Sequence, residues 1–336
     1  MTIADLEHFR NLLLQKQESV GDWLNAGPAT SSQAVERAQA LMAEIKDALE
    51  RVKNKTFGAC QVCHDEVERY RLEVQPTTKV CLGCISPKEQ QELEDELSLA
   101  SKIHRALLPQ SASRIDGFDV AVKSFAARAV GGDYFDFMPA GDNLMDRIII
   151  ADAMGKGVPA GLLMSNVQAA LRILGEEIES PSALVTKLNR WLCRNIPVTK
   201  FVSLICVALE SGRRRESRVL IANAGHCSPI LVSSDGKSRA LQHSGGVLGV
   251  HEDFVYDNQE LVLKSGDGLF LYTDGVVEAE SPSEEMFGEE RLTEFLVANR
   301  ATPLHQLPDL IHGELLQFIA KSELADDFTV IAIRKI

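Results

Sequence analysis

Two long segments near the N-terminus carry a stripe of mainly apolar residues at every third or fourth position, which is the spacing of amphipathic helices. The stripes run through Leu6, Phe9, Leu13, Lys16, Val20 and Trp23, and through Val35, Ala38, Met42, Ile45, Leu49 and Val52. Between them the segment NAGPATSS supplies helix breakers, and Thr30 with Gln33 forms a capping box for the second helix. The pattern predicts a helical hairpin with a coiled-coil-like seam over residues 1–56.

A third helical stripe lies in residues 88–110 and ends at Pro109. Its apolar positions are Leu93, Leu97, Ala100, Ile103 and Leu107. We interpret this segment as a linker helix. Two roles stay open for it: a spacer that packs on the following domain, or a helix that pairs two chains and carries a signal between domains.

From residue 111 onward, short apolar runs alternate with glycine turns and longer helical segments. Strands are expected at FDVAVKSF, RIIIAD, FVSLICVAL, RVLIANAG, PILVSS, GLFLYTDG and DFTVIAIRK. Helices are expected at residues 159–177, 181–195, 289–298 and 304–320. Because the strands come mostly in succession, with helices grouped between sets of strands, the pattern predicts a layered α+β fold over residues 111–336.

Length and composition limit the classes of protein that remain. A chain of 336 residues is too long for one ordinary domain, and 45% hydrophobic with 25% charged residues is typical of globular proteins. Since no apolar run reaches the roughly 20 residues of a membrane span and no signal peptide is recognisable, we expect a cytoplasmic protein with no membrane contact. The net charge of −13 opposes direct binding to nucleic acid.

Four of the seven cysteines form two Cys-x-x-Cys pairs that are separated by 17 residues. They are Cys60, Cys63, Cys81 and Cys84. This spacing predicts a four-thiolate zinc site within residues 57–87, in preference to a redox dithiol. The remaining cysteines are scattered through apolar contexts and are expected to be small core residues.

Six aspartates lie at the edges of predicted strands in the C-terminal region. They are Asp133 and Asp136 in VGGDYFDF, Asp152 in IIIADAMGKG, Asp274 in LFLYTDGVVEAE, and Asp326 and Asp327 in ELADDFTVIAIR. An isolated Asp-Gly pair is a turn signal, but acids that converge from four strand ends would repel one another unless a cation compensated their charge. Oxygen ligands suit Mg²⁺ or Mn²⁺, so the pattern predicts a divalent metal site.

The cysteine-rich segment resembles a known family. FGACQVCHDEVERYRLEVQPTTKVCLGC, preceded by a helical hairpin, is similar to the DksA/TraR zinc-finger proteins, which bind RNA polymerase. Gly58, the RLEVQP segment and the cysteine spacing carry this resemblance over about the first 87 residues. Those regulators have acidic residues at the hairpin tip, whereas NAGPATSS has none. The difference favours an inherited architecture over an inherited activity.

A second resemblance covers residues 111–336. The segments AVGGDYFDF, ADAMGKGVPAGLLMS, ANAGHCSPIL, GGVLGV, LFLYTDGVVEAES and ADDFTVIAI resemble, in order, the motifs of PPM/PP2C-type serine/threonine phosphatases of the bacterial RsbU/SpoIIE branch. LASKIHRALLP is similar to the helix that precedes this catalytic domain. The resemblance implies a PP2C-like β-sandwich flanked by helices, preceded here by the helical hairpin and the small zinc finger.

The second resemblance also implies the catalytic residues and their cofactors. Asp152 would bridge two Mn²⁺ or Mg²⁺ ions with help from the Ala153 backbone carbonyl, Asp274 and Asp326 would hold the second ion, and Asp133 would act chiefly through water. The ions would activate water for attack on a serine or threonine phosphate. One structural Zn²⁺ completes the expected metals.

Two further residues of these motifs have an ordinary structural interpretation as well as a functional one. His226 in NAGHCSP is expected to shape a turn rather than to act as a general acid. Lys156 in the GKG sequence is expected to be a solvated loop residue, with attraction of phosphate as the alternative. Substrate-binding residues are not identified by the sequence.

The resemblances together imply a function and its rivals. The expected substrate is a phosphorylated anti-sigma-factor antagonist of a bacterial partner-switching pathway, and the zinc module is expected to regulate a homodimer through the linker helix. One alternative is a DksA-like regulator that contacts RNA polymerase. The other is a catalytically inactive scaffold with a phosphatase fold. The set of acids argues against the scaffold, and the neutral hairpin tip argues against the polymerase regulator.

Overall fold

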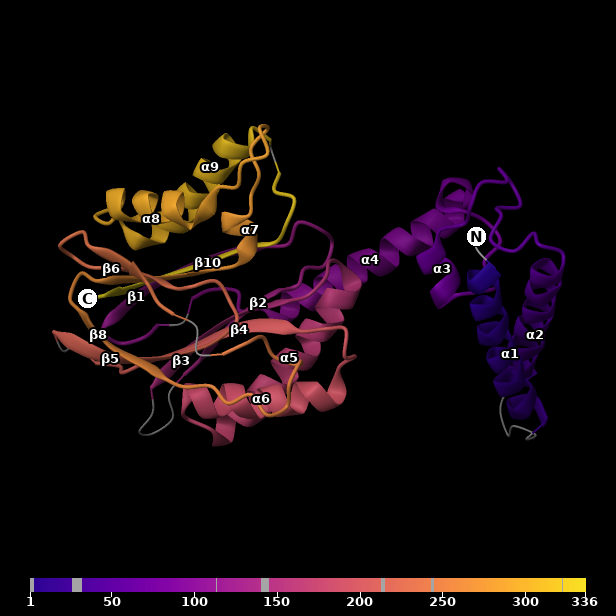
Figure 1. Ribbon diagram of the computed structural model, residues 1–336, viewed down its shortest axis with the longest axis horizontal. Helices are drawn as coiled ribbons and strands as arrows, with labels where there is room; N and C mark the ends of the chain where they lie inside the picture. Colours follow the sequence, from indigo (N-terminus) through magenta and orange to yellow (C-terminus); the bar gives the residue numbers. More distant parts are fainter. Residues whose placement is uncertain are drawn as a thin grey trace. The chain divides into compact units, whose positions relative to one another are not determined.

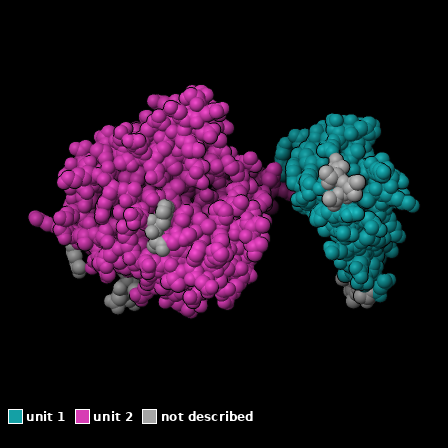
Figure 2. Space-filling model, viewed as in Figure 1, with its two compact units in different colours: residues 1–95 teal, residues 96–336 magenta. Residues whose placement is uncertain are grey.

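The computed structural model describes residues 3–25, 32–112, 114–139, 145–212, 215–242, 245–321 and 323–336. The chain divides into two compact units, Met1–Asp95 and Glu96–Ile336 (Figure 2). Each unit contains its own hydrophobic core. No helix among the described residues is both long enough and apolar enough to span a bilayer.

The first unit begins with two helices of nearly equal length at the predicted places, α1 (Ile3–Asn25) and α2 (Ser32–Lys53). Phe9 and Leu13 of α1 and Ile45 of α2 are fully buried in one cluster. These three residues belong to the two stripes that predicted the hairpin, so burial of the stripes stabilises the helix pair.

The far part of the hairpin differs from the expected seam. Trp23 is 39% exposed and, together with Leu41 and other small or apolar residues, lines an open groove along the two helices. The seam is therefore closed around Phe9 and Leu13 and open toward Trp23. Thr30 of the expected capping box lies outside the described residues.

The cysteine-rich segment packs into the same core as the hairpin. It contains the short helix α3 (Arg69–Val74) and the 3-10 turn η1 (Leu82–Cys84). Phe57 and Leu72 are buried in the cluster that includes Phe9, and the Phe9 and Phe57 ring centroids lie 5.4 Å apart. Neither element encloses an apolar core alone, so hairpin and finger stabilise each other.

The next helix, α4 (Pro87–Leu107), contains the boundary between the two units. Its start has a capping box: Glu89 Oε2 accepts the Ser86 N–H at 2.9 Å, and Ser86 Oγ accepts the Glu89 N–H at 3.3 Å. Leu97 and Ile103 of the predicted stripe are 37% and 57% exposed. The helix is present as expected, and much of its apolar stripe faces solvent.

The second unit contains two five-stranded sheets in which all neighbouring strands are antiparallel. The first sheet has the order β1 (Phe118–Phe125), β10 (Phe328–Lys335), β9 (Gly268–Tyr272), β6 (Ile230–Val232) and β7 (Ser238–Ala240). The second has the order β2 (Asp133–Met138), β3 (Asp146–Ala153), β4 (Val202–Leu209), β5 (Glu216–Ala224) and β8 (Gln259–Lys264). A cluster of buried aliphatic and aromatic residues joins the two sheets.

Helices cover the outer faces of the sandwich (Figure 1). Helices α5 (Val158–Glu177) and α6 (Pro181–Asn195) pack on the second sheet. Helices α8 (Gly288–Ala298) and α9 (Leu307–Ile319) pack on the first sheet. The prediction of a layered α+β fold is confirmed, and the four long helices lie where the pattern placed them.

Among the described residues of the second unit, three strands and one helix were not expected from the sequence. Every residue of β2 is buried, so its acids interrupt an otherwise apolar pattern and hide the strand. Strand β7 is exposed and only three residues long, and β8 is a half-polar edge strand. The single-turn helix α7 (Asp274–Val277) follows β9 directly, and the short turn η2 (Leu304–Gln306) precedes α9. Short and edge elements carry too little periodicity to be predicted.

Candidate active site

The register of the second sheet brings two of the predicted acids together. Strands β2 and β3 pair so that Asp133 lies directly opposite Asp152. Asp133 is buried, and its Oδ2 accepts hydrogen bonds from the Thr273 hydroxyl at 2.8 Å and the Thr329 hydroxyl at 2.7 Å. Thr329 lies in β10 and Thr273 directly follows β9, both of the first sheet. Asp133 of the second sheet therefore connects the two sheets.

Two more of the six predicted acids approach from the first sheet. Asp274 follows the end of β9, and Asp326 lies just before β10, which pairs with β9. Burial, and then the charges of Asp274 and Asp326, raise the pKa of the Asp152 carboxyl to about 7. Burial, together with Glu278 and Asp326, also raises the pKa of Asp274. The acids therefore act on one another at one end of the sandwich, although they come from separate strands.

Glycines allow the backbone to pass closely between these acids. A Cβ atom at Gly132 would lie 2.7 Å from the Ala153 carbonyl oxygen and 3.1 Å from Asp152 Oδ1. A Cβ atom at Gly275 would overlap the Asp327 carbonyl oxygen. Any larger residue at either position would push apart the segments that carry the acids.

Asp327, next to the predicted ligand Asp326, has a different position. Its two carboxylate oxygens accept the Ala127 N–H at 2.8 Å and the Gly132 N–H at 2.6 Å. Asp327 therefore holds the loop before β2 against the start of β10. The ADD motif contains both acids. Asp327 binds the loop, and its charge also helps to raise the pKa of Asp133 and of Asp152.

The structure does not bring Asp136 into this group. Asp136 is fully buried, and its carboxylate accepts hydrogen bonds from the Tyr134 hydroxyl and from Arg172, each at 2.6 Å. Asp136 lies three residues after Asp133 on a strand, so the two side chains point to opposite faces of the sheet. The motif places both acids on one strand, and alternation then separates them.

The sequence did not identify three polar side chains of the site. Thr273 and Thr329 bind Asp133, and Glu278 contributes to the raised pKa of both Asp152 and Asp274. Glu278 follows Asp274 by four residues, the spacing of neighbours on a helix, and Thr273 directly precedes Asp274. These spacings are visible in the sequence, but they indicate neighbouring side chains only once α7 is known to be a helix.

His226 and Lys156 can now be placed. The His226 N–H donates to Asn223 Oδ1 at 2.9 Å, and the Asn223 amide donates to the His226 carbonyl at 3.1 Å, so His226 shapes a turn as expected. Its Nδ1 lies 2.7 Å from Ser203 Oγ. Lys156 is an exposed loop residue, as expected, and it also forms an ion pair with Asp326, with 2.7 Å between Nζ and Oδ2.

The acids fit a pair of divalent cations. Carboxylate and carbonyl oxygens are hard ligands, and the raised pKa values of Asp152 and Asp274 report negative charges confined together in a buried place. The ligands expected from the sequence are Asp152 with the Ala153 carbonyl, and Asp274 with Asp326. When bound there, such ions would activate water and offset the charge of a phosphate.

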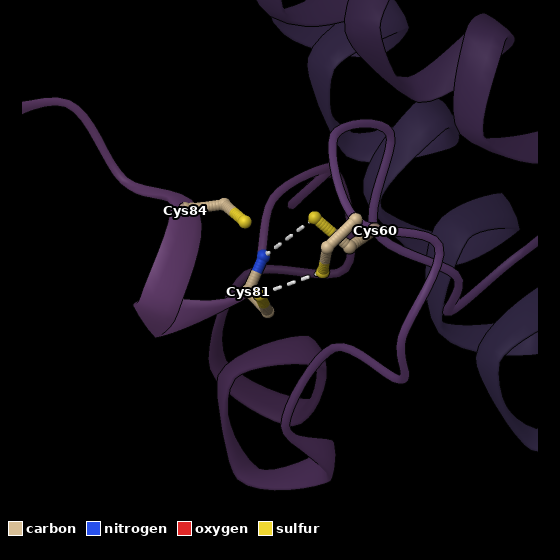
Figure 3. A group of neighbouring side chains, drawn as sticks. Cys60, Cys81 and Cys84 are labelled. Carbon is tan, nitrogen blue, oxygen red and sulfur yellow. Dashed lines mark hydrogen bonds between the residues drawn. The ribbon is translucent and has the colours of Figure 1, made fainter.

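The four predicted cysteines form a second group of metal-binding side chains, in the first unit. Their sulfur atoms all lie within 4.8 Å of one another, and Figure 3 shows Cys60, Cys81 and Cys84 converging. Burial raises the pKa of the Cys60 thiol, but N–H groups of Cys63, Cys81 and Val62 donate to its sulfur and bring the pKa down to about 6. Four converging thiols with one easily ionised member fit a tetrahedral Zn²⁺.

We expect the purified protein to contain about one zinc per chain and to lose it in the Cys60→Ser variant. Zinc contributes roughly 10 to 16 kcal/mol to such sites in isolated peptides, so its loss should unfold the finger and expose Phe57. Elemental analysis and limited proteolysis would measure both effects. Cys193→Ser, outside the cluster, is the matched control and should keep its zinc. Full zinc content in Cys60→Ser would contradict the assignment.

The raised pKa of Asp152 predicts that binding of Mn²⁺ depends on pH. The cation needs the ionised carboxylate, so affinity should fall by about tenfold per pH unit below 7 and level off above it. Conversely, the manganese-free protein should lose stability as the pH rises from 3.8 toward 7, since folding favours the protonated acid. Calorimetric titrations with Mn²⁺ between pH 6 and 8 would test this. An affinity independent of pH would contradict it.

Comparison with known proteins agrees with this geometry. Residues 146–335, more than half of the chain, match the family model of Stage II sporulation protein E (SpoIIE). Residues 55–90 match the prokaryotic dksA/traR C4-type zinc finger. The first match includes Asp152, Asp274 and Asp326, and the second includes all four clustered cysteines.

Individual relatives resemble different parts of the chain. The phosphoserine phosphatase RsbU of Bacillus subtilis is 29% identical over 248 residues, which cover 73% of this chain and 72% of RsbU. The RNA polymerase-binding transcription factor DksA of Buchnera aphidicola is 35% identical over 57 residues, only 17% of this chain and 38% of DksA. The SiaA-PP2C domain of Pseudomonas aeruginosa shares the fold, with a TM-score of 0.64 and 24% identity over 73% of this chain and 98% of that domain. The chain therefore belongs to the SpoIIE family, in the RsbU/SpoIIE branch of the PPM/PP2C-type serine/threonine phosphatases.

Proposed function

We propose that this protein removes phosphate from a serine or threonine of a partner-switching protein, of the class of anti-sigma-factor antagonists. The observation that carries the proposal is the convergence of Asp133, Asp152, Asp274 and Asp326 at one end of a PP2C-like sandwich. The similarity to a phosphoserine phosphatase supports the choice of substrate class. The presence of these acids together disfavours a catalytically inactive scaffold.

Each acid has a role in this proposal. Asp152 would be shared by two Mn²⁺ or Mg²⁺ ions, with the Ala153 carbonyl helping on one side, while Asp274 and Asp326 would hold the other ion. Asp133 is held in place by two threonine hydroxyls. It would therefore act on the ions through water that it orients. The substrate phosphate binds at this end of the sandwich, where Asp326 and Lys156 are partly exposed.

We also propose that the zinc module regulates the phosphatase through α4. His104, near the end of α4, is buried, and its ring binds the Gly131 backbone, which lies two residues before Asp133. A Cβ atom at Gly161 of α5 would lie 3.3 Å from the His104 ring and would overlap Val130. A movement of α4 would therefore reach the loop that positions Asp133, and so change the population of active molecules.

The same helix provides a dimerisation surface in this proposal. Leu93, Leu97 and Ile103 are between 37% and 57% exposed, although they form one apolar stripe. A second copy of the helix would bury that stripe and make a homodimer, which would act in the cytoplasm. Contact of the zinc finger with RNA polymerase is the alternative role of the first unit, favoured only by the match to DksA.

We expect phosphatase activity to need added Mn²⁺ or Mg²⁺ and to fall by at least about a hundredfold in Asp152→Asn and in Asp274→Asn. Each change removes a negative ligand but nearly preserves shape. Release of phosphate from phosphorylated antagonist proteins would measure activity, and circular dichroism would verify folding. Asp146→Asn, at the other end of β3, is the control. Full turnover by a folded Asp152→Asn protein without divalent metal would refute the proposal.

Replacement of both Leu97 and Ile103 by Glu should give monomers with altered phosphatase activity. Four charges would face each other in the paired stripe, whereas the monomer would leave them in water. Light scattering and phosphate release would measure the two effects. Ser98→Glu with Lys102→Glu places acids on exposed positions of the same helix outside the stripe and should remain dimeric. An unchanged oligomeric state and rate in the first variant would assign the stripe to a role within one chain.

A further inference from the structure

Lys156 occupies an unexpected position for a lysine in a metal-binding region. It lies in the loop between β3 and α5, and its Nζ is 2.7 Å from Asp326 Oδ2 and 3.5 Å from the Ala325 carbonyl. Asp326 is one of the proposed ligands of the second metal ion. A positive side chain of the protein is therefore bound to the carboxylate that would hold the ion.

The charges around Lys156 explain why it binds there. Asp152, Asp274, Asp326 and Glu278 repel one another, as the raised pKa of Asp152 indicates. Lys156 also acts on Asp274, whose pKa it lowers against the larger effect of burial. One ammonium group therefore offsets part of the negative charge of the whole group. This stabilises the manganese-free protein without closing the site.

The Lys156–Asp326 pair is suited to exchange. The two side chains are 45% and 42% exposed, and an ion pair with this exposure is weak enough to be replaced. Gly155 and Gly157 flank the lysine with φ angles of +116° and +73°, which other residues rarely adopt. Within the described residues, nothing lies within 4 Å of a Cβ atom built at Gly157. The loop therefore has both the backbone freedom and the space to carry Lys156 away from Asp326.

We propose that Lys156 is an internal cation that holds Asp326 until a divalent metal ion displaces it. Contact of both the ammonium group and the ion with the Asp326 carboxylate would bring two cations close together, and these repel each other. Binding of the second metal ion is thereby coupled to movement of residues 154–157. Lys156 is a positioning residue in this proposal, and it sets the metal concentration at which the site fills. The inference rests on the proposed metal site.

The test compares Mn²⁺ binding by the wild-type protein with binding by Lys156→Gln, in full-length chains dialysed until they retain zinc but no manganese. Calorimetric titration with MnCl₂ should show the weaker of the two sites binding about three- to fivefold more tightly in the variant, because no ammonium group competes. Lys156→Arg keeps the charge and should resemble the wild type. Lys321→Gln removes a lysine that lines the pocket beside Asp326 and should leave binding unchanged.

Thermal unfolding provides a second measurement that a purely structural role of Lys156 would not reproduce. Without manganese, Lys156→Gln should unfold at a lower temperature than the wild type, because the acids lose their internal cation. With saturating Mn²⁺, this difference should vanish or reverse. A structural residue would lower the midpoint equally under both conditions.

The outcomes separate this inference from the metal site on which it rests. If the wild type binds no Mn²⁺, the proposed metal centre is wrong, and the role of Lys156 fails with it. If the wild type binds Mn²⁺ but Lys156→Gln shows the same affinity and the same thermal gain, the metal centre stands and the role of Lys156 is overturned. Equal tightening by Lys321→Gln would also overturn it, because general charge would then explain the effect.

Discussion

Mutual repulsion between carboxylates is the constraint on which the C-terminal unit depends. Two like charges about 4 Å apart repel by about 4 kcal/mol at the effective dielectric constant near a protein surface. The sandwich nevertheless directs Asp133 and Asp152 from one sheet, and Asp274 and Asp326 from the other, toward the same end. The apolar layer between the sheets fixes the strand ends against this repulsion.

Much of this fold and site could be predicted from the sequence. Long periodic segments gave the major helices, apolar runs gave seven strands, and acids at strand ends marked Asp152, Asp274 and Asp326. The sequence left Asp136 and Asp327 without a role among the six acids. In the structure Asp136 binds Arg172, and Asp327 accepts a hydrogen bond from Gly132. The orientation of Asp136 follows from alternation once β2 is known to be a strand, whereas the contact of Asp327 with Gly132 joins segments far apart in the chain.

In the first unit, the cysteine motif can be recognised from the sequence more easily than the hydrophobic core that packs against it. Spacing alone identified the four cysteines, but it did not show that the finger and the hairpin form one core around Phe9 and Phe57. Arg51 of α2 strengthens this connection by donating to the Thr77 and Thr78 carbonyls at 3.1 and 3.3 Å. A disturbance of the metal-binding segment must therefore reach the helices, so the unit responds as a whole.

The bond between Asp133 and the two threonines has a consequence for how this protein can change over evolutionary time. One carboxylate both serves the acidic end of the sandwich and joins its two sheets through Thr273 and Thr329. A substitution of Asp133 would change both the acidic site and the contact between the two sheets. Selection therefore cannot adjust one of these properties while leaving the other fixed. A lineage that loses catalysis would have to replace Asp133, Thr273 and Thr329 together to keep the sheets joined. Catalytically inactive descendants should therefore differ at all three positions.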